Sequence, residues 1–350
     1  MKTSVDPSRL LTLVDAIAGC RVAVAGDLIA DEFIYGEIAR VSREAPVLIL
    51  NYDSTEVVPG GAGNAAGNVA ALGGAARVVG LAGRDETGRR LLANLKRRRV
   101  DTSSIIRPAG YRTPTKTRIL AGGIHSAKQQ VVRIDRAAAA TVDDRTRAAF
   151  ESRVLRAVRG ADALILSDYG SGLVLPALVT EARSIFRRRG RAAPIVVDSR
   201  YDLLHFHGMT ACTPNESEVE QALGIRIGDN TRILERAGRT LLVRTHAPAV
   251  LITRGSRGMA LFERGKPAVH IPIVGTDQIA DVTGAGDTVI ATLTLALSAG
   301  ATFEDAARLA NYAGGLVVMK RGTATVSASE LRYAISGGAI GRSPHPGPGA

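Results

Sequence analysis

Short apolar segments alternate with helix-like stretches along most of this chain, from residue 76 to residue 324. Apolar segments of four to eight residues bounded by turns are typical of strands that are buried on both faces. Their alternation with helices predicts an α/β fold, with a doubly wound, mainly parallel sheet between two layers of helices. Ligands of such folds bind at the carboxyl ends of the strands. The clearest segments are 163–168, 194–198, 210–214 and 249–253.

Acidic residues follow two of the predicted strands. Asp27 comes directly after the apolar segment 21–26, with Asp31 four residues further on, and Asp168 ends segment 163–168. Because the carboxyl ends of parallel strands share one edge of a sheet, these carboxylates are candidates for contacts with substrate hydroxyl groups. For Asp31, an ordinary turn aspartate explains the sequence about as well, so both interpretations stay open.

Two segments, within about residues 32–58 and 112–135, have strand-like composition and little helical period. We expect them to form a small second sheet, which is either a lid over the site or a surface that pairs with another subunit. Residues 1–336 then form one domain. The glycine- and proline-rich end, residues 337–350, is expected to be a disordered tail.

A glycine-rich turn at residues 284–286 leads through Asp287 into an apolar helix that reaches residue 299. The N–H groups of Gly284, Ala285 and Gly286 can converge where the positive end of the helix dipole lies, which suits an anion. A carboxylate in such a place is a poor anion binder and a good base. The segment therefore predicts phosphoryl transfer, with Asp287 accepting a proton from the attacking hydroxyl. An aspartate that only caps the helix is the alternative.

A second glycine-rich segment spans residues 59–73. Gly60 and Gly61 would allow close backbone approach at a helix N-terminus, and Asn64 and Asn68, one turn apart, would face the same ligand. Residues 61–66 also match a dinucleotide-binding fingerprint, which makes an oxidoreductase the remote alternative. That fingerprint must leave a strand tightly, whereas a proline intervenes here.

Residues 213–218 (Thr-Pro-Asn-Glu-Ser-Glu) follow a predicted strand and begin a helix. Asn215 and Glu218 have the spacing of a capping box. The functional alternative is that both residues hold, through waters, the magnesium ion that accompanies a nucleotide triphosphate. Segment 253–258 predicts a hairpin turn, whose glycines would also let the backbone lie along a nucleotide.

The net charge of +12 favours an anionic partner. The excess is mostly arginine scattered along the chain, tryptophan is absent, and aromatic residues make up only 4% of the sequence. The interleaving of basic and aromatic residues that stacks nucleic-acid bases is therefore missing. We expect a phosphorylated small-molecule substrate and no nucleic acid.

The two cysteines, Cys20 and Cys212, lie far apart without a metal-binding or redox spacing. No apolar run has the length of a membrane span, and the N-terminal residues lack the apolar core of a signal peptide. These features predict a cytoplasmic protein without a membrane partner.

Segments 59–64, 213–218 and 281–287 have the order and spacing of the ribokinase-like (PfkB) carbohydrate kinases, and the resemblance covers residues 20–332. It implies a sheet with a β lid, ATP and Mg²⁺, and transfer of the γ-phosphoryl group to a sugar hydroxyl. Asp287 matches the catalytic base and residues 284–286 the anion hole. Gly60, Gly61 and Asn64 match the sugar motif. We expect nucleotide contacts from Asn215, Glu216, Ser217, Glu218, Thr253, Gly255, Gly258 and Asn311, with Asn215 and Glu218 also serving the metal.

Within that family the chain resembles the D-glycero-β-D-manno-heptose 7-phosphate kinases, most clearly at residues 26–31, 40–47, 115–118, 129–135, 166–170 and 320–326. The likeness implies phosphorylation of the anomeric hydroxyl, on the route to ADP-heptose for the lipopolysaccharide core. Lys116 and Arg118 become candidates for the distal phosphate of the sugar. The likeness also implies a homodimer that pairs through the lid sheets.

The chain departs from that pattern at two places. Ser171 stands where these kinases have a lysine, and Ser199 and Arg200 replace a Pro-Lys pair, so Arg200 can supply one of the two charges. The acceptor therefore stays open between heptose 7-phosphate and another sugar, sugar phosphate or nucleoside. Many such kinases carry a fused nucleotidyltransferase domain; we expect no adenylyl transfer from these 350 residues.

Overall fold

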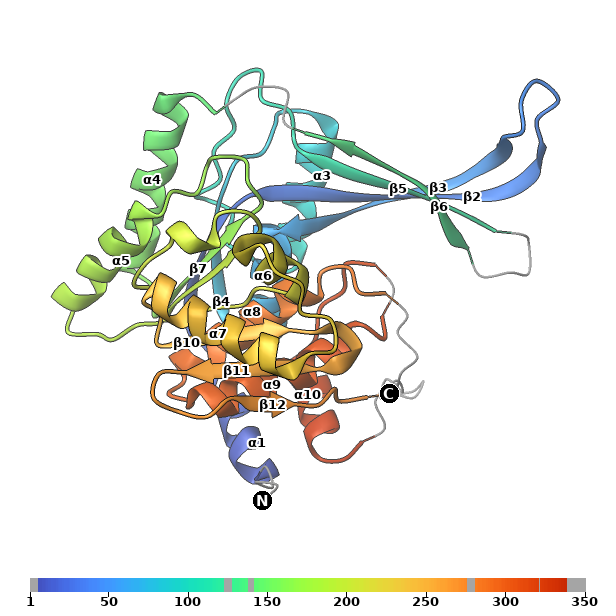
Figure 1. Cartoon of the computed structure of the whole chain (residues 1–350). Coiled ribbons are helices and arrows are strands. Elements are labelled where there is room, and N and C mark those ends of the chain that lie inside the picture. The colour runs from blue at the N-terminus through green and yellow to red at the C-terminus, as the bar shows by residue number, and fades with distance from the viewer. Residues whose placement is uncertain (1–5, 123–127, 138–141, 276–280, 321, 339–350) are drawn as a thin grey trace, which may run out of the picture.

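Eight strands form the central sheet, in the order β12-β11-β10-β9-β8-β7-β1-β4 (Figure 1). The six strands from β10 to β4 are parallel, and β11 runs antiparallel to both of its neighbours. The predicted doubly wound, mainly parallel sheet is thus confirmed. Its strands are β1 (Arg21–Gly26), β4 (Ala75–Val79), β7 (Ala163–Asp168), β8 (Ile195–Ser199), β9 (Ala211–Cys212), β10 (Ala249–Thr253), β11 (Met259–Glu263) and β12 (Val269–Ile271).

Helices cover both faces of this sheet because successive strand residues point to opposite sides. Val22 and Val24 pack into one apolar cluster, whereas Ala23 and Ala25 pack into the other. The first cluster includes residues of α1 (Pro7–Ala16), α2 (Ala62–Ala71), α3 (Glu86–Arg97), α8 (Ala285–Ser298), α9 (Phe303–Val317) and α10 (Ala328–Ile335). The second includes residues of α4 (Asp144–Arg159), α5 (Ala177–Arg188), α6 (Glu216–Leu223) and α7 (Thr231–Thr245).

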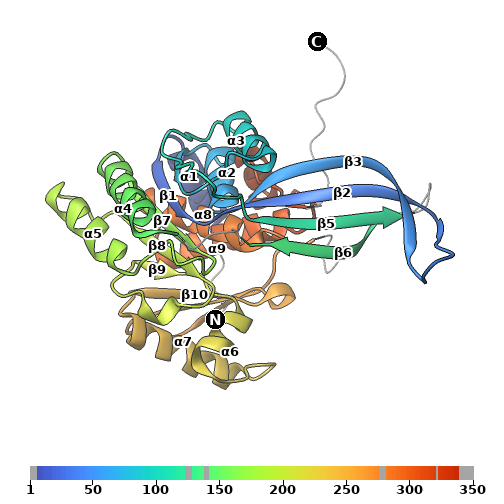
Figure 2. The same cartoon turned by 90° about the horizontal axis from the view of Figure 1, so that it is seen from above.

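A separate four-stranded sheet projects away from the helices as a long arm (Figure 2). Its order is β3-β2-β5-β6; β2 and β5 are parallel, and the other two pairs are antiparallel. The strands are β2 (Leu28–Val41), β3 (Leu48–Gly61), β5 (Thr115–Gly122) and β6 (Gln129–Arg136). The small second sheet predicted from the two strand-rich segments is therefore present.

The root of the arm is continuous with the central sheet. Asp27 alone separates the end of β1 from the start of β2, and β3 leads into α2 without an intervening residue. Leu28 pairs with Gly61 at the root, so both strands of the hairpin leave the core together. The arm therefore begins at the carboxyl edge of the central sheet, where the fold predicts a ligand.

This structure is a computed structural model that describes residues 6–122, 128–137, 142–275, 281–320 and 322–338. Most of the tail predicted at residues 337–350 lies outside these ranges. Across the described ranges, none of the helices has the length and apolar character needed to cross a membrane.

Candidate active site

A cavity of about 560 Å³ opens at the carboxyl edge of the central sheet, beneath the root of the arm. Its walls come from the small sheet, the ends of β7, β8 and β10, and the first turn of α8. Thirteen of the predicted site residues line it: Lys116, Arg118, Asp168, Asn215, Glu218, Thr253, Gly255, Gly258, Gly284, Ala285, Gly286, Asp287 and Asn311.

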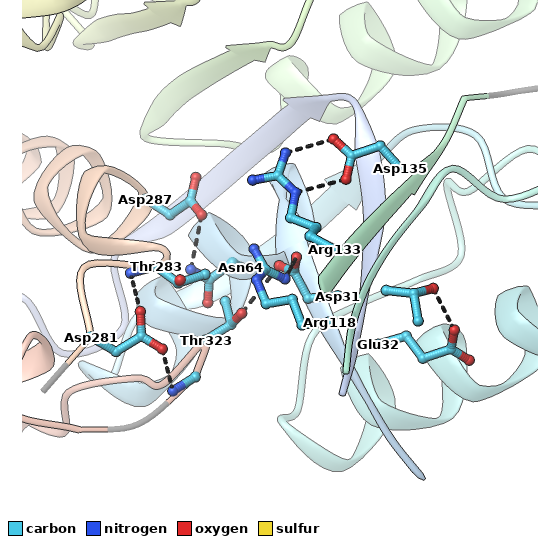
Figure 3. Close-up of polar contacts among 12 residues, drawn as sticks. Asp31, Glu32, Asn64, Arg118, Arg133, Asp135, Asp281, Thr283, Asp287 and Thr323 are labelled. Atoms are coloured by element: carbon cyan, nitrogen blue, oxygen red, sulfur yellow. Dashed lines mark hydrogen bonds and ion pairs between the residues drawn. The ribbon is translucent and has the colours of Figure 1, made fainter. Parts of the chain in front are cut away.

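Asp287 lies in the first turn of α8 and is 3% exposed. The helix-cap interpretation is wrong, because Gly284 occupies the cap position and Asp287 accepts its side-chain hydrogen bonds from other elements. Asn64 Nδ2 donates to Oδ2 at 2.9 Å, and the Tyr169 hydroxyl donates to Oδ1 at 3.3 Å. Figure 3 shows Asn64 directed at the carboxylate from α2.

Burial raises the pKa of Asp287 to about 7. The hydrogen bond from Asn64 lowers this pKa, the negative charge of Asp31 raises it, and Tyr169 and Lys116 lower it. A carboxylate with a pKa near neutrality can both accept a proton and release it at physiological pH, as a general base requires.

The turn before Asp287 depends on Gly284, which has a φ of 77°. A Cβ atom at this position would lie 2.5 Å from Asn64 Nδ2, so the turn and α2 are in direct contact. The predicted anion hole is partly occupied by the turn itself, since the Ala285 N–H donates to the Val282 carbonyl at 3.2 Å. Asp281 holds the turn by accepting from the N–H groups of Thr283 and Gly322 at 2.8 and 3.0 Å (Figure 3).

Asn68 does not face the cavity, contrary to expectation. It is fully buried behind Asn64, where its side chain donates to the Asn64 carbonyl at 3.1 Å and accepts from the Thr288 hydroxyl at 3.1 Å. It therefore ties α2 to α8. The Asn64–Asp287 contact rests on this helix pair.

The predicted substrate residues Asp27, Asp31, Gly60 and Gly61 lie behind the cavity wall instead of lining it. Asp27 accepts from the Tyr169 N–H at 2.7 Å and from the Ser171 hydroxyl. Gly60 is needed because a Cβ there would lie 2.4 Å from Asp31 Oδ2. Sequence reasoning placed these carboxylates at the correct edge but missed the partners that occupy them.

Arg118 lines the cavity, yet its charge is already paired. Its Nη1 lies 2.6 Å from Asp31 Oδ1, and both side chains are at most 10% exposed. Asp31 also accepts from the Thr323 hydroxyl at 3.1 Å (Figure 3). Arg118 thus holds the arm strand β5 to β2, and its contact with the distal phosphate of the acceptor stays a prediction.

Lys116 is the cation beside Asp287 that has no direct ion pair among the described residues. Its Nζ lies 5.0 Å from the centre of the Tyr169 ring, a cation–π contact. Burial lowers the pKa of Lys116, and the guanidinium groups of Arg200 and Arg133 lower it further, while Asp31 and Asp135 raise it. An anion bound beside Lys116 would therefore stabilise its charged form.

The predicted capping box is present at the start of α6. Asn215 Oδ1 accepts from the Glu218 N–H, and Glu218 Oε2 accepts from the Asn215 N–H, each at 2.9 Å. Asn215 also forms an isolated parallel β-bridge with Thr253 at the end of β10. This backbone pairing brings two of the predicted nucleotide segments together. Burial raises the pKa of Glu218, although Asn215 and Arg200 oppose this effect.

Residues 23–330 match the family described as "pfkB family carbohydrate kinase". The chain belongs to this family. It is therefore a carbohydrate kinase, and the dinucleotide-binding alternative fails. Its fingerprint residues, 61–66, follow a strand of the small sheet, not a strand of the parallel sheet.

Curated relatives named "Bifunctional protein HldE" support the same assignment. The kinase is 39% identical to the protein from Desulfatibacillum aliphaticivorans over 320 residues and 41% identical to that from Caulobacter sp. (strain K31) over 324 residues. These matches cover 91% and 92% of this chain but 64% of each relative. The chain thus spans less than two thirds of the length of these relatives.

Solved structures share the fold at low sequence identity. Ribokinase from Arabidopsis thaliana, solved with ribose and ATP, superposes with a TM-score of 0.70 at 20% identity, covering 91% of this chain and 99% of that one. Phosphofructokinase-2 from Escherichia coli, solved with substrates and products, gives 0.70 at 18%, with coverages of 93% and 100%. The kinase therefore has the ribokinase-like fold.

The predicted nucleotide residues differ in whether they line the cavity of this kinase. Asn311 lines the part near α9, where its Nδ2 donates to the Pro272 carbonyl at 2.7 Å. Gly258 is required in the hairpin turn, because a Cβ there would lie 2.1 Å from the Ile271 carbonyl oxygen. Two predicted nucleotide residues do not reach the cavity: Glu216 pairs with Arg254 at 2.7 Å, and Ser217 is not among the lining residues.

The residues around Glu218 fit a magnesium ion held through waters better than one held directly. Among the described residues, no group of three acidic, histidine or cysteine side chains is arranged to bind a metal. Glu218 and Asn215 each use one side-chain oxygen in the capping box, and the second Glu218 oxygen has no hydrogen-bond partner in the part of the chain that the structure describes. A hydrated Mg²⁺ keeps several waters and needs only one or two carboxylates.

Sequence reasoning missed Tyr169 and Asp198 in the cavity wall of the kinase. Asp198 follows the pattern already used for Asp168, a polar residue at the end of a buried segment, so the same signal could have found it. Burial holds the pKa of Asp198 well above its ordinary value, and the nearby charges of Glu218, Asp287 and Asp168 add to the effect. The role of Tyr169 depends on contacts that only the fold creates.

Proposed function

We propose that this kinase transfers the γ-phosphoryl group of ATP to the anomeric hydroxyl of D-glycero-D-manno-heptose 7-phosphate. The proposal joins the kinase family to the sequence likeness with heptose 7-phosphate kinases. The product is a precursor of ADP-heptose for the lipopolysaccharide core. Such a reaction takes place in the cytoplasm, where ATP is available.

Asp287 is the proposed general base. Its carboxylate accepts the proton of the attacking hydroxyl while the acceptor oxygen forms a bond to the γ-phosphorus and the bond to the β-phosphate oxygen breaks. Asn64 orients the carboxylate through its 2.9 Å hydrogen bond. Gly286 lines the cavity in the first turn of α8, and a Cβ atom there would meet no atom within 4 Å, so a ligand can approach this helix N-terminus closely. The helix dipole is suited to stabilise charge on the transferred group.

Mg²⁺ supplies charge neutralisation on the triphosphate when it is bound. Glu218 and Asn215 would hold it through waters, because both side chains already serve the helix cap. Asp198, at the end of β8, is close enough to Glu218 for their charges to interact.

The position of Lys116 is the observation that carries the choice of a phosphorylated acceptor. It is half-buried beside Asp287 without a direct carboxylate partner among the described residues, and Arg200 adds a second positive charge nearby. Two cations in the cavity wall that have no direct ion pair among the described residues suit an acceptor that brings its own phosphate. A neutral sugar would leave both charges without a partner.

A homodimer through the arm sheets is the proposed assembly. Eight of the twelve large exposed apolar residues in the described chain belong to the arm: Ile38, Val41, Val47, Leu48, Tyr52, Val131, Val132 and Ile134. Apolar side chains gathered on a sheet that projects into solvent mark an interaction surface. A second copy would cover them.

The acceptor is tested by measuring ATP consumption with heptose 7-phosphate, fructose phosphates, ribose and nucleosides. We expect turnover with heptose 7-phosphate and a KM for that acceptor that rises at least about tenfold in Lys116→Met. Lys128→Met is the matched control, since Lys128 lies on the arm and pairs with Asp53. Turnover with another member of the panel but none with heptose 7-phosphate would overturn the acceptor assignment and leave the kinase assignment intact.

A further inference from the structure

Tyr169 touches the proposed base Asp287, Lys116 and the root of the arm at once. Its hydroxyl donates to Asp287 Oδ1 at 3.3 Å, and Lys116 Nζ lies 5.0 Å from the centre of its ring. Its backbone N–H donates to Asp27 Oδ2 at 2.7 Å. These contacts join the end of β7 to α8, to β5 and to the single residue between β1 and β2.

The ring of Tyr169 packs closely against the backbone at Gly61. A Cβ atom at Gly61 would lie 3.3 Å from Tyr169 Cε2, and Gly61 itself has a φ of 56°, which favours glycine. Asp27, the acceptor of the Tyr169 N–H, also receives the Ser171 hydroxyl. The backbone and the ring are therefore held from different sides.

We propose that Tyr169 is a positioning residue that aligns Asp287 for proton transfer and supports Lys116 at the acceptor site. This inference rests on the proposed role of Asp287 as the base. Asn64 holds one carboxylate oxygen and Tyr169 holds the other, so together they fix the rotation of the carboxylate. Each oxygen keeps a second lone pair, which leaves room for the hydroxyl that is to be deprotonated.

The hydroxyl of Tyr169 also favours the ionised form of Asp287. A hydrogen bond donated to a carboxylate stabilises the charge, so its loss disfavours ionisation. The other groups that face Asp287 are Asn64 on α2, Asp31 on β2, Lys116 on β5 and Asp198 on β8. All of them remain in a variant that lacks only the Tyr169 hydroxyl.

The test compares Tyr169→Phe with the full chain over pH 5 to 9, using the best acceptor from the panel above. We expect the acid limb of kcat/KM to move up by about one pH unit, because the variant loses one hydrogen bond to a charged group. At pH 7 this gives a several-fold loss of kcat/KM. Tyr201→Phe is the matched control, because Tyr201 is 57% exposed and does not contact Asp287 among the described residues.

A second variant separates the ring from the hydroxyl. Tyr169→Leu removes the surface beneath Lys116, so we expect the KM for the acceptor to rise beyond the value for Tyr169→Phe, at least about threefold. Unchanged thermal midpoints would show that both variants fold. An acid limb of Tyr169→Phe that superposes on that of the original protein would overturn the inference.

Asp287→Asn in the same assay distinguishes the two proposals. Loss of turnover in Asp287→Asn together with an unmoved acid limb in Tyr169→Phe would overturn the role of Tyr169 alone. Near-normal turnover in Asp287→Asn would instead overturn the base assignment, and the inference about Tyr169 with it.

Discussion

Asn64 and Asp287 are 223 positions apart in the chain, yet Asn64 Nδ2 lies 2.9 Å from Asp287 Oδ2. Asn64 is in the first turn of α2, directly after the arm, and Asp287 is in the first turn of α8. The two glycine-rich segments of the sequence thus meet as two helix N-termini. The proposed base and the residue that orients it come from the two ends of the family domain, which spans residues 23–330.

Replacing Asp287 with asparagine should remove the base while keeping the shape of the side chain. We expect kcat to fall by about 10³-fold or more, with nucleotide affinity retained, since the amide cannot accept the hydroxyl proton. Steady-state kinetics and ATP titration calorimetry measure the two effects. Asp144→Asn, at a fully exposed side chain, is the control and should leave both values unchanged.

The raised pKa of Asp287 predicts how activity depends on pH. With a pKa of about 7, the carboxylate is ionised above neutrality, so kcat/KM should fall about tenfold per pH unit below it. A profile that stays flat down to pH 5 would contradict this assignment. The acid limb of kcat/KM should be measured with acceptor concentrations well below KM, where it reports the pKa of the base in the free enzyme.

The same pKa shift predicts a stability difference that needs no substrate. Because the folded pKa of Asp287 is raised above the ordinary value near 4, the folded state holds this proton more tightly between pH 4 and pH 7. Stability therefore falls as pH rises through that window. The thermal midpoint of Asp287→Asn minus that of the original protein should therefore increase from pH 4 to pH 7. The difference should then stay constant up to pH 8.

Gly284 should not tolerate a side chain. Alanine at this position meets Asn64 Nδ2 at 2.5 Å and must also adopt a φ of 77°. We expect Gly284→Ala to displace Asn64 and lower kcat by at least about tenfold. Gly300→Ala is the matched control: its φ is 88°, but no atom lies within 4 Å of the added Cβ. Equal losses of activity in both variants would mean that backbone strain, and not the contact with Asn64, causes the effect.

Glu218→Gln tests the metal role separately from the helix cap. Glutamine can still accept from the Asn215 N–H, so the thermal midpoint should change little, whereas loss of the charge should raise the Mg²⁺ concentration for half-maximal activity about tenfold. The chain offers a matched control in the second capping box, at Ser327 and Glu330 in α10. Glu330→Gln should leave the Mg²⁺ response unchanged.

A charge on the arm should separate the proposed dimer. Val132 on β6 is 44% exposed, and Val132→Asp places a carboxylate in the apolar surface that a second copy would cover. Light scattering after size exclusion should change from twice the mass of the chain to the mass of one chain. Val243→Asp, at a 70% exposed valine on α7, should remain dimeric. A monomeric original protein would contradict the assembly.

The sequence predicts those parts of the site that depend on local structure. The glycine turn before Asp287 and the capping box at Asn215 and Glu218 each combine turn residues with the start of a helix, and both are where the pattern places them. Their spacing is visible within a few residues. The α/β class follows in the same way from alternation along the chain.

The remainder depends on contacts between distant segments. The sequence leaves Asp31 open between a substrate contact and a turn residue, but the fold pairs it with Arg118, 87 residues away. No local pattern singles out Tyr169, because its contacts with Asp27 and Asp287 form only when β7 lies beside β1 and α8. Asn68 reads as a second ligand residue, whereas the close approach of α2 and α8 buries it. Each of these outcomes is decided by packing, which the local pattern does not encode.

The continuity at the root of the arm limits how this protein can be recombined with its relatives. One residue joins β1 to β2, and none separates β3 from α2. A cut at the root therefore falls beside Asp27, which accepts from the Tyr169 N–H, or beside Gly61, which borders the Tyr169 ring. A chimaera that exchanges the whole arm would also exchange the strand β3 that leads directly into α2, the helix that carries Asn64. Crossover points, and changes in length between related proteins, are expected instead at the far end of the hairpin, within residues 42–47.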